Sequence, residues 1–372
     1  MELKPIIGVV GLGTMGLGIA QVYAAAGFRV LATDAYAPAR DSAVLRLAAQ
    51  LDLRVASAKL TVQARDATLA ALTIVPELAA LAPAGLVIEA ILEDAGAKQN
   101  LFRSLEAVIA PDAVLATNTS SIPVATVAQA LQHPSRVLGL HFFNPAPVMR
   151  LVELVGHAGT SATALALARQ VAEAAGKTVI QCPDRPGFIV NRCARPYYGE
   201  ALALLEEGYS AAEIDGAMLA AGYRLGPFSL IDLIGADINL AATFGLYQAM
   251  GRHPRYLPFD ALNLRVERGD LGRKSGRGFV HPATVTAVQN DAIALRIEAT
   301  LINEACFLAA EGVAPQGIDT AMRLGLNFPH GPFEALQGYG KARILVTLAA
   351  LEAKAPPHLK TRYLPAPYLE AA

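Results

Sequence analysis

The chain has 372 residues, of which 53% are hydrophobic and 17% are charged, and its formal net charge is −1. This length exceeds what one ordinary domain packs around a single core, so we expect a nucleotide-binding unit and one or two smaller domains. The near-neutral charge argues against a nucleic-acid partner, and no apolar run reaches the roughly 18 residues that a membrane-spanning helix needs.

The start of the chain and the cysteines bear on location and on metal binding. The first residues run directly into a predicted strand without the pattern of a signal peptide, so we expect a soluble, cytoplasmic protein. Cys182, Cys193 and Cys306 are far apart and form no metal-ligand pattern. We therefore interpret them as small core residues and predict no metal site.

In the first half of the chain, short apolar runs rich in β-branched residues alternate with alanine-rich stretches of helical character. This alternation is typical of parallel βαβ units and predicts an α/β Rossmann fold with a doubly wound sheet. Residues 38–71 are predicted to form one or two helices that project from the sheet. The predicted strands are 6–10, 29–33, 73–75, 86–89, 114–117, 137–141, 151–155 and 179–182.

After residues 183–187 the strand signals stop, and the pattern becomes that of amphipathic helices separated by Gly and Pro. Three sequence blocks in this half occur twice and in the same order, which indicates a duplicated helical domain. We expect domains at 1–184, 185–282 and 288–372, the last being a degenerate copy. The blocks begin at Glu200, Ile214 and Gly226 and again at Glu304, Ile318 and Gly331.

A glycine-rich motif follows the first predicted strand and opens a helix that we expect to run to Ala26. In a G-x-G-x-x-G motif, the three glycines permit a tight turn, a close approach to a pyrophosphate and close helix packing. Asp34 ends the second strand, where a carboxylate can accept hydrogen bonds from a ribose diol and would repel a 2′-phosphate. The motif therefore predicts NAD rather than NADP, bound by Gly11, Leu12, Gly13, Thr14, Met15, Gly16 and Asp34.

Two polar stretches end neighbouring predicted strands, N-T-S-S at 118–121 and H-F-F-N-P at 141–145. Both lie at the carboxyl edge of the sheet, where ligands of open α/β sheets bind. Glu153 stands in the middle of an apolar strand, where a carboxylate is costly without a partner. We expect His141 to be that partner.

These stretches are similar to those of the L-3-hydroxyacyl-CoA dehydrogenase family, and the similarity spans nearly the whole chain. The duplicated helical domain further resembles the dehydrogenase part of multifunctional fatty-acid oxidation enzymes and bacterial 3-hydroxyadipyl- or 3-hydroxybutyryl-CoA dehydrogenases. The stretches that carry the resemblance are GVVGLGTMGLGIA (8–20), VIEAILED (87–94), NTSSIPV (118–124), HFFNPAPVMRLVELV (141–155), DRPGFIVNR (184–192), GPFSLIDLIGAD (226–237) and GRKSGRGF (272–279).

The resemblance implies reversible, NAD-dependent oxidation of (S)-3-hydroxyacyl-CoA to 3-ketoacyl-CoA in fatty-acid or related metabolism. It makes His141 the general base, oriented by Glu153, with Ser120 holding the substrate oxygen. Asn191 would donate its amide to the reacting oxygen or the thioester carbonyl, as in an oxyanion hole. The residues that the resemblance assigns to the cofactor are Glu93, Lys98, Ser120, Asn144 and Lys274.

The repeat offers an internal comparison for Asn191. At the same place in the second copy stands Leu295, whereas Arg192 corresponds to Arg296. The second copy is therefore interpreted as structural, covering a helical surface that shorter family members use to dimerise. The protein could then be a monomer or a homodimer.

Several alternatives remain open from the sequence. The family's CoA-binding Ser and Lys are not cleanly reproduced in the projecting helices, where Gln50 and Ser57 stand, with Arg54 and Lys59 as cationic substitutes. Lys274 could instead belong to a solvated basic loop. A β-hydroxyacid dehydrogenase of the 6-phosphogluconate type would need a lysine base, and a catalytically silent NAD-binding structural protein would not need the set of Ser120, His141, Glu153 and Asn191.

Overall fold

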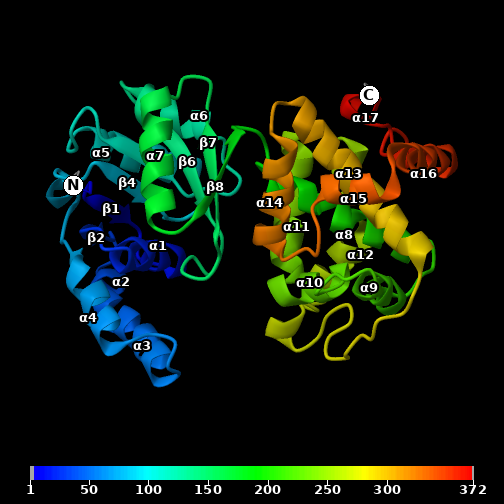
Figure 1. The fold of residues 1–372 in the computed structure, drawn as a ribbon, viewed down its shortest axis with the longest axis horizontal. Coiled ribbons are helices and arrows are strands. Elements are labelled where there is room, and N and C mark those ends of the chain that lie inside the picture. The colour runs from blue at the N-terminus through cyan, green and yellow to red at the C-terminus, as the bar shows by residue number, and fades with distance from the viewer. Residues whose placement is uncertain (1–3, 371–372) are drawn as a thin grey trace. The chain divides into compact units, whose positions relative to one another are not determined.

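The computed structural model describes residues 4–370, and the chain divides into two compact units, one ending at Arg185 and the other beginning at Pro186 (Figure 1). The first unit is an α/β domain and the second is helical. The boundary lies one residue from the one predicted at 184/185. Both predicted helical copies lie within the second unit, and their division into two domains stays a prediction.

The first unit is built on one eight-stranded sheet in the order β3-β2-β1-β4-β5-β6-β7-β8. Each predicted strand is present within two residues at either end. Neighbouring strands are parallel except β6 and β7, which form an antiparallel pair. The strands are β1 (Ile7–Val10), β2 (Val30–Thr33), β3 (Leu72–Ile74), β4 (Leu86–Glu89), β5 (Val114–Thr117), β6 (Val137–Phe142), β7 (Leu151–Gly156) and β8 (Thr178–Pro183).

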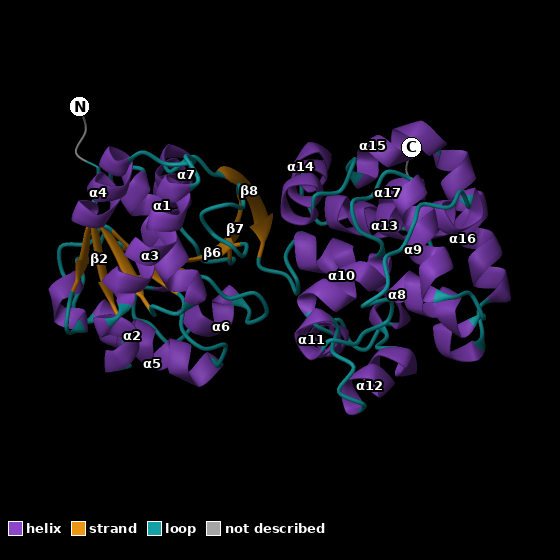
Figure 2. Cartoon of the chain, turned by 90° about the horizontal axis from the view of Figure 1, so that it is seen from below, coloured by secondary structure: helices purple, strands orange, loops and turns teal. Residues whose placement is uncertain are grey.

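Helices cover both faces of this sheet, as a doubly wound fold requires (Figure 2). The segment predicted to form one or two helices forms three, because a break at Ser42 separates a short first helix from the long pair that follows. The helices are α1 (Thr14–Ala25), α2 (Ala37–Asp41), α3 (Ala43–Ala56), α4 (Val62–Ala71), α5 (Ala95–Glu106), α6 (Val124–Ala128) and α7 (Ala162–Ala174).

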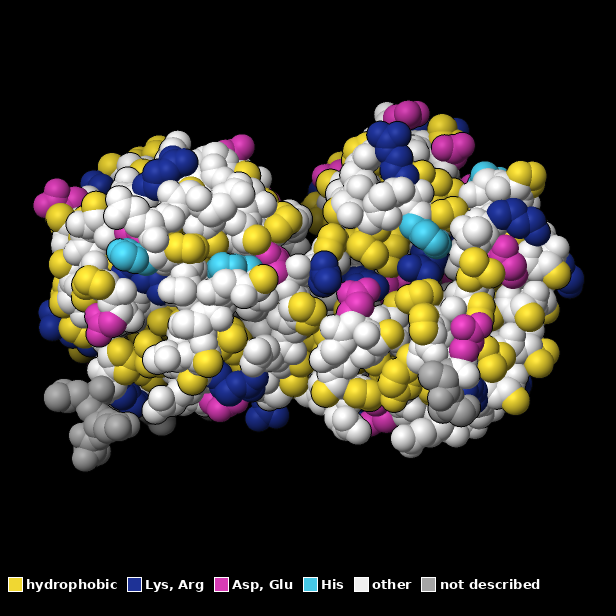
Figure 3. Space-filling model, turned by 90° about the horizontal axis from the view of Figure 1, so that it is seen from above, with side chains coloured by type: hydrophobic (Ala, Val, Ile, Leu, Met, Phe, Trp, Pro, Cys, Tyr) yellow, Lys and Arg dark blue, Asp and Glu magenta, His cyan; other side chains and the backbone are white. Residues whose placement is uncertain are grey.

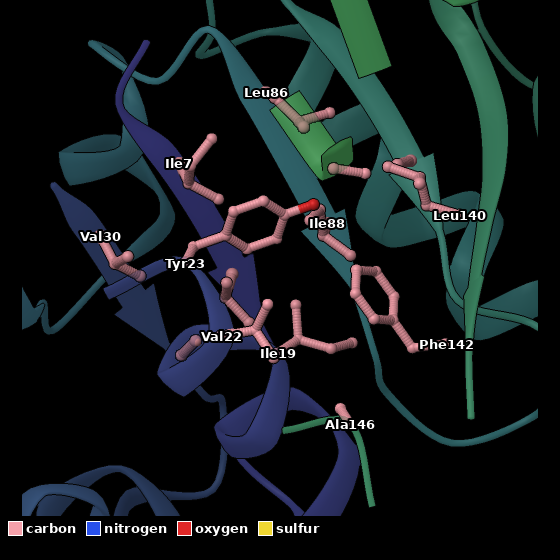
Figure 4. Packing of buried hydrophobic residues seen from close by; sticks show 14 of the residues in the cluster. Ile7, Ile19, Val22, Tyr23, Val30, Leu86, Ile88, Leu140, Phe142 and Ala146 are labelled. Atoms are coloured by element: carbon pink, nitrogen blue, oxygen red, sulfur yellow. The ribbon is translucent and has the colours of Figure 1, made fainter. Parts of the chain in front are cut away.

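The core of the first unit fixes the helix that follows the glycine-rich loop. Ile19 and Tyr23 of α1 are fully buried and lie over Ile7, Ile88 and Phe142 of the sheet (Figure 4). The ring of Tyr23 meets that of Phe142 edge-on at 6.2 Å between centroids. Because α1 is held along its length, the loop at its N-terminus is held in a defined place above β1.

The second unit consists of helices whose order repeats. The helix α8 and its counterpart α13 pack side by side, and each is followed by the same succession of shorter helices. The helices are α8 (Val190–Glu206), α9 (Ala211–Ala220), α10 (Pro227–Ile234), α11 (Ala236–Ala249), α12 (Asp260–Glu267), α13 (Asp291–Ala310), α14 (Pro315–Leu326), α15 (Pro332–Tyr339), α16 (Lys341–Lys354) and α17 (Pro367–Glu370).

Reciprocal ion pairs join α8 and α13. Arg192 donates to buried Glu304 at 2.7 Å and forms a two-bonded pair with Glu311 at 2.8 Å. At the equivalent positions, Arg296 donates to buried Glu200 at 2.7 Å and to Glu207 at 2.6 and 2.7 Å. The same contact is thus made twice in opposite directions, which is the pattern of a two-fold, self-complementary interface.

A second buried cluster is centred on Glu298 of the second copy and has no equivalent around the first copy's Ala194. His330 Nε2 lies 2.7 Å from Glu298 Oε1, and the hydroxyl groups of Tyr223 and Tyr339 also donate to this carboxylate. The first copy has Ala194 where the second has Glu298. The hydrogen bond with Glu298 raises the pKa of His330 although partial burial opposes it.

This cluster predicts a pH-dependent stability. Because the folded state holds the proton on His330 more tightly than the unfolded state, the contribution is complete below about pH 6.5 and is lost as pH rises through the raised pKa. We expect His330→Gln to lower the melting temperature more at about pH 5.5 than at about pH 8.5. The exposed His358→Gln is the control, and an equal loss at both pH values would contradict the prediction.

No single helix among residues 4–370 is long and apolar enough to cross a membrane; α10 and α11 reach that length and apolarity only when taken together, across a bend of 103°. On the face shown in Figure 3, Lys and Arg side chains are scattered among acidic and uncharged ones.

Candidate active site

A cavity of about 640 Å³ lies at the carboxyl ends of β1 and β2 in the first unit. Ligands of doubly wound sheets bind at this edge, where the strand order reverses. The lining of this cavity suits an adenosine, because apolar side chains can pack against the base and the carboxylate of Asp34 can bond the ribose. Its lining includes Gly11, Gly13, Asp34, Tyr36, Pro76 and Leu92.

The glycine-rich loop has the geometry that the motif predicts. Gly11 has a φ of +94°, and a Cβ there would lie 2.5 Å from the carbonyl oxygen of Ala90; at Gly16 it would lie 1.8 Å from the carbonyl oxygen of Gly11. At Gly13, by contrast, a Cβ would meet nothing within 4 Å. The space over Gly13 at the N-terminus of α1 therefore fits a pyrophosphate, which unpaired backbone N–H groups would bind.

Asp34 is held rigidly at the end of β2. Its Oδ2 accepts the N–H of Leu12 at 2.6 Å, and its Oδ1 accepts the N–H of Tyr36 at 2.8 Å. Each carboxylate oxygen keeps a lone pair that a ribose diol could use. The carboxylate thus ties the glycine-rich loop to the place where the adenosine ribose of NAD would lie.

His141 and Glu153 form a buried pair on neighbouring strands. They stand directly opposite each other in the antiparallel pairing of β6 with β7, which places their side chains on the same face. His141 Nδ1 lies 2.6 Å from Glu153 Oε2, and the side chains are 8% and 0% exposed. This geometry confirms the predicted pairing of His141 with Glu153. Because Glu153 holds Nδ1, the ring nitrogen that can exchange a proton with a ligand is Nε2.

The loop at 118–121 lies at the same edge. Asn118 accepts the N–H of Phe142 at 2.8 Å, so its side chain ties the end of β5 to the end of β6. Ser120 is exposed on this loop, and its N–H donates to Glu93 at 2.9 Å. Asn118 was in the predicted motif without a role, and only the pairing of the strands reveals one.

Asn144 follows His141 on an exposed turn, and the sequence did not show which residues hold this turn in place. The structure shows one of them, Lys177, whose ammonium group donates to the carbonyls of Ala146 and Met149 at 2.6 and 2.7 Å. Burial lowers the pKa of Lys177 to about 8. Nothing in the sequence around Lys177 distinguishes it from an ordinary surface lysine, so this support could not have been predicted.

Of the remaining predicted site residues, Asn191 and Lys274 lie in the second unit and Lys98 lies in the first. Asn191 is half-buried near the start of α8. Lys274 is 43% exposed and pairs with Asp237, in the first turn of α11, at 2.5 Å. Lys98 of the first unit is 1% exposed and contacts Glu89 and Glu93.

Family models match both units. The model described as 3-hydroxyacyl-CoA dehydrogenase, NAD binding domain, matches residues 6–185. The model described as 3-hydroxyacyl-CoA dehydrogenase, C-terminal domain, matches residues 187–281 and 293–371. The two ranges of the second match coincide with the two halves of the repeat.

Relatives of known name agree with these models. The chain is 44% identical to a 3-hydroxyadipyl-CoA dehydrogenase of Escherichia coli K12 over 73% of its own length and 58% of the relative's. It is 42% identical to a 3-hydroxybutyryl-CoA dehydrogenase of Mycobacterium tuberculosis, over 73% of this chain and 96% of that one. The crystal structure of a 3-hydroxybutyryl-CoA dehydrogenase from E. coli K12 matches with a TM-score of 0.93 at 34% identity, covering 99% of this chain and 98% of the other.

Proposed function

The chain belongs to the 3-hydroxyacyl-CoA dehydrogenase family and is an NAD-dependent oxidoreductase, and we propose that it interconverts (S)-3-hydroxyacyl-CoA and 3-ketoacyl-CoA with His141 as general base. The observation that carries this proposal is the buried pair of His141 and Glu153 at the carboxyl edge of the sheet. A histidine at this edge, with its far nitrogen against a carboxylate, is equipped to move a proton to and from a hydroxyl group.

In the oxidative direction, His141 Nε2 takes the proton of the 3-hydroxyl group while C3 loses a hydride. Glu153 holds the other ring nitrogen and stabilises the imidazolium that forms. NAD, when bound, supplies the acceptor for the hydride. In the reductive direction, the imidazolium returns its proton to the carbonyl oxygen as the hydride arrives.

Ser120 and Asn191 take the polar binding roles in this proposal. The hydroxyl of Ser120 holds the substrate oxygen, and the amide of Asn191 donates to that oxygen or to the thioester carbonyl. Glu93, Asn144 and Lys274 complete the cofactor contacts that the resemblance implies. Neither buried lysine described in the first unit favours the lysine base of the rival class, because Lys98 contacts carboxylates and Lys177 contacts carbonyl groups.

The test is NADH oxidation in the presence of acetoacetyl-CoA, followed by absorbance. We expect turnover, and we expect NADPH to be a much poorer substrate because Asp34 would repel its 2′-phosphate. If acetoacetyl-CoA fails, longer and carboxylated 3-ketoacyl-CoA thioesters are tried next. NADH binding without turnover of any of these thioesters would favour the silent NAD-binding protein.

We propose that the C-terminal end of α3 and the turn that follows it recognise CoA. Arg54 and Lys59 are exposed, whereas the hydroxyl of Ser57 bonds the carbonyls of Leu53 and Arg54 and so serves the helix end. We expect Arg54→Ala with Lys59→Ala to raise the KM for acetoacetyl-CoA by roughly 10-fold, because charge-assisted bonds to phosphate are lost. An unchanged KM in steady-state kinetics would reject both residues.

We further propose that the protein acts in the cytoplasm, as a monomer or a homodimer. The monomer or homodimer is supported by the pairing of α8 with α13 within one chain. Light scattering would test the oligomeric state, and a tetramer would contradict this proposal.

A further inference from the structure

A buried cation lies beneath the loop that carries Ser120, and it joins two carboxylates. Lys98 of α5 is 1% exposed, and its ammonium group lies 2.5 Å from Glu89 and 3.3 Å from Glu93. Glu89 itself is fully buried at the end of β4. A lysine is almost never buried to this extent unless it is paired, so these contacts account for its position.

Glu89 is the fixed end of this arrangement. Its Oε1 also accepts the N–H of Ile91 at 2.7 Å, and its Oε2 accepts the hydroxyl of Thr117 at 2.7 Å. The Glu89 carboxylate is therefore bonded to the segment that follows β4 and to the last residue of β5. Lys98 in turn is anchored to this carboxylate.

Glu93 is the second carboxylate that Lys98 contacts, and one of its oxygens accepts several hydrogen bonds from the loop at 118–121. Its Oε1 accepts the hydroxyl of Thr119 at 2.6 Å, the N–H groups of Ser120 and Ser121 at 2.9 and 3.0 Å, and the hydroxyl of Ser121 at 2.9 Å. Its Oε2 faces Lys98. Burial alone would raise the pKa of Glu93, but the bond from Thr119 and the charge of Lys98 bring it below its usual range.

We propose that Lys98 is a positioning residue, which fixes Glu93 so that this carboxylate presents the Ser120 loop to the substrate oxygen. Glu89, which accepts the hydroxyl of Thr117, holds Lys98 in turn. The role of Ser120 in this proposal rests on the proposed function. The resemblance assigns Lys98 to the cofactor. Its side chain, however, is 1% exposed and pairs with two carboxylates, so in this proposal its charge acts on the loop through Glu93.

The variant that tests the proposal combines Lys98→Met with Glu89→Gln, and we call it the Lys98 variant. This pair of changes removes one positive and one negative charge, so that it leaves no unpaired buried charge beside Thr117. We expect kcat for acetoacetyl-CoA reduction to fall by roughly 10- to 10²-fold, the scale of a misplaced polar group. We expect the Kd for NADH to change much less than kcat, because Lys98 itself is 1% exposed and Glu93 keeps its bonds from Thr119 and Ser121.

Gln99→Met is the matched control, because Gln99 is the next residue on α5 and bonds only the carbonyl of Thr126 among the described contacts of its side chain. The control should keep the kcat of the natural chain. A higher Kd for NADH in the Lys98 variant, with kcat unchanged, would mean that Lys98 binds the cofactor and would overturn the proposal.

A double-mutant cycle with Ser120→Ala separates positioning from general damage. If Lys98 acts through the hydroxyl of Ser120, the Lys98 variant should lower kcat much less on the Ser120→Ala background than on the natural one. Equal losses on both backgrounds would show that Lys98 acts elsewhere and would overturn the proposal while leaving the proposed function intact.

Hydrogen exchange of the Ser120 and Ser121 amides, measured by NMR, tests the loop without any substrate. In the Lys98 variant these amides should exchange about 10-fold faster or more, because opening of the loop costs less. The Leu12 amide, which donates to Asp34, is the internal reference for general unfolding. Unchanged exchange at Ser120 and Ser121 would overturn the proposal, even if no acyl-CoA thioester proved to be a substrate.

Discussion

Replacing His141 with glutamine should lower kcat for acetoacetyl-CoA reduction by about 10²-fold or more, the scale of a lost general acid–base group. Glutamine can still form a hydrogen bond with Glu153, but it cannot carry the proton that the reaction must move. The Kd for NADH should stay near its natural value. Steady-state kinetics and a fluorescence titration with NADH measure the two quantities on the same preparation.

Glu153→Gln is the matched variant for this experiment. It keeps the shape of the pair but removes the charge that stabilises an imidazolium, so its kcat should also fall. The size of the fall measures how much the carboxylate stabilises the imidazolium that forms in the reaction. A His141→Gln enzyme within about 3-fold of the natural kcat would remove His141 from the proton transfer.

Replacing Arg192 with methionine should destabilise the helical unit by about 3–5 kcal/mol, the cost of breaking a buried ion pair by removal of one partner. The change leaves Glu304, which is fully buried, without its closest cation and deprives Glu311 of its two-bonded partner. Both pairs raise the pKa of Arg192 further above its already high value despite burial, so the charge is firmly held. Urea denaturation followed by circular dichroism gives the free energy of unfolding.

Arg192→Met with Glu304→Gln is the control for that result. Because this double variant leaves no unpaired charge on Glu304, it should recover part of the stability. Arg296→Met, the equivalent change in the other copy, should also destabilise the unit. A loss of less than about 1 kcal/mol from Arg192→Met would mean that the pair contributes no more than a surface ion pair.

Sequence reasoning located the sheet well because each strand is a short apolar run and because Gly11, Gly13 and Gly16 have few other uses directly after a strand. It also paired His141 with Glu153, since a carboxylate in an apolar strand needs a partner. It could not predict how many helices residues 38–71 form, because nothing in the apolar pattern marks the break at Ser42.

The contacts of Lys98 with Glu89 and Glu93 could not be predicted from the sequence either. Along the chain, Glu89, Glu93 and Lys98 lie four and five residues apart, and only the position of α5 against the end of β4 brings their charges together. The repeat was evident from its blocks, yet the reciprocal bonds of Arg192 and Arg296 were not. A recurring motif indicates that two segments fold alike, but it does not show which of their faces meet.

That reciprocal contact joins two parts of a single chain, so dilution cannot separate them. A self-complementary contact between two subunits dissociates as the protein concentration falls, and its stability depends on that concentration. Here the linker between Gly278 and Asn290 keeps each copy at a high effective concentration beside the other. Because the contact persists regardless of dilution, either copy can change its remaining surfaces as long as the residues that join the two are kept.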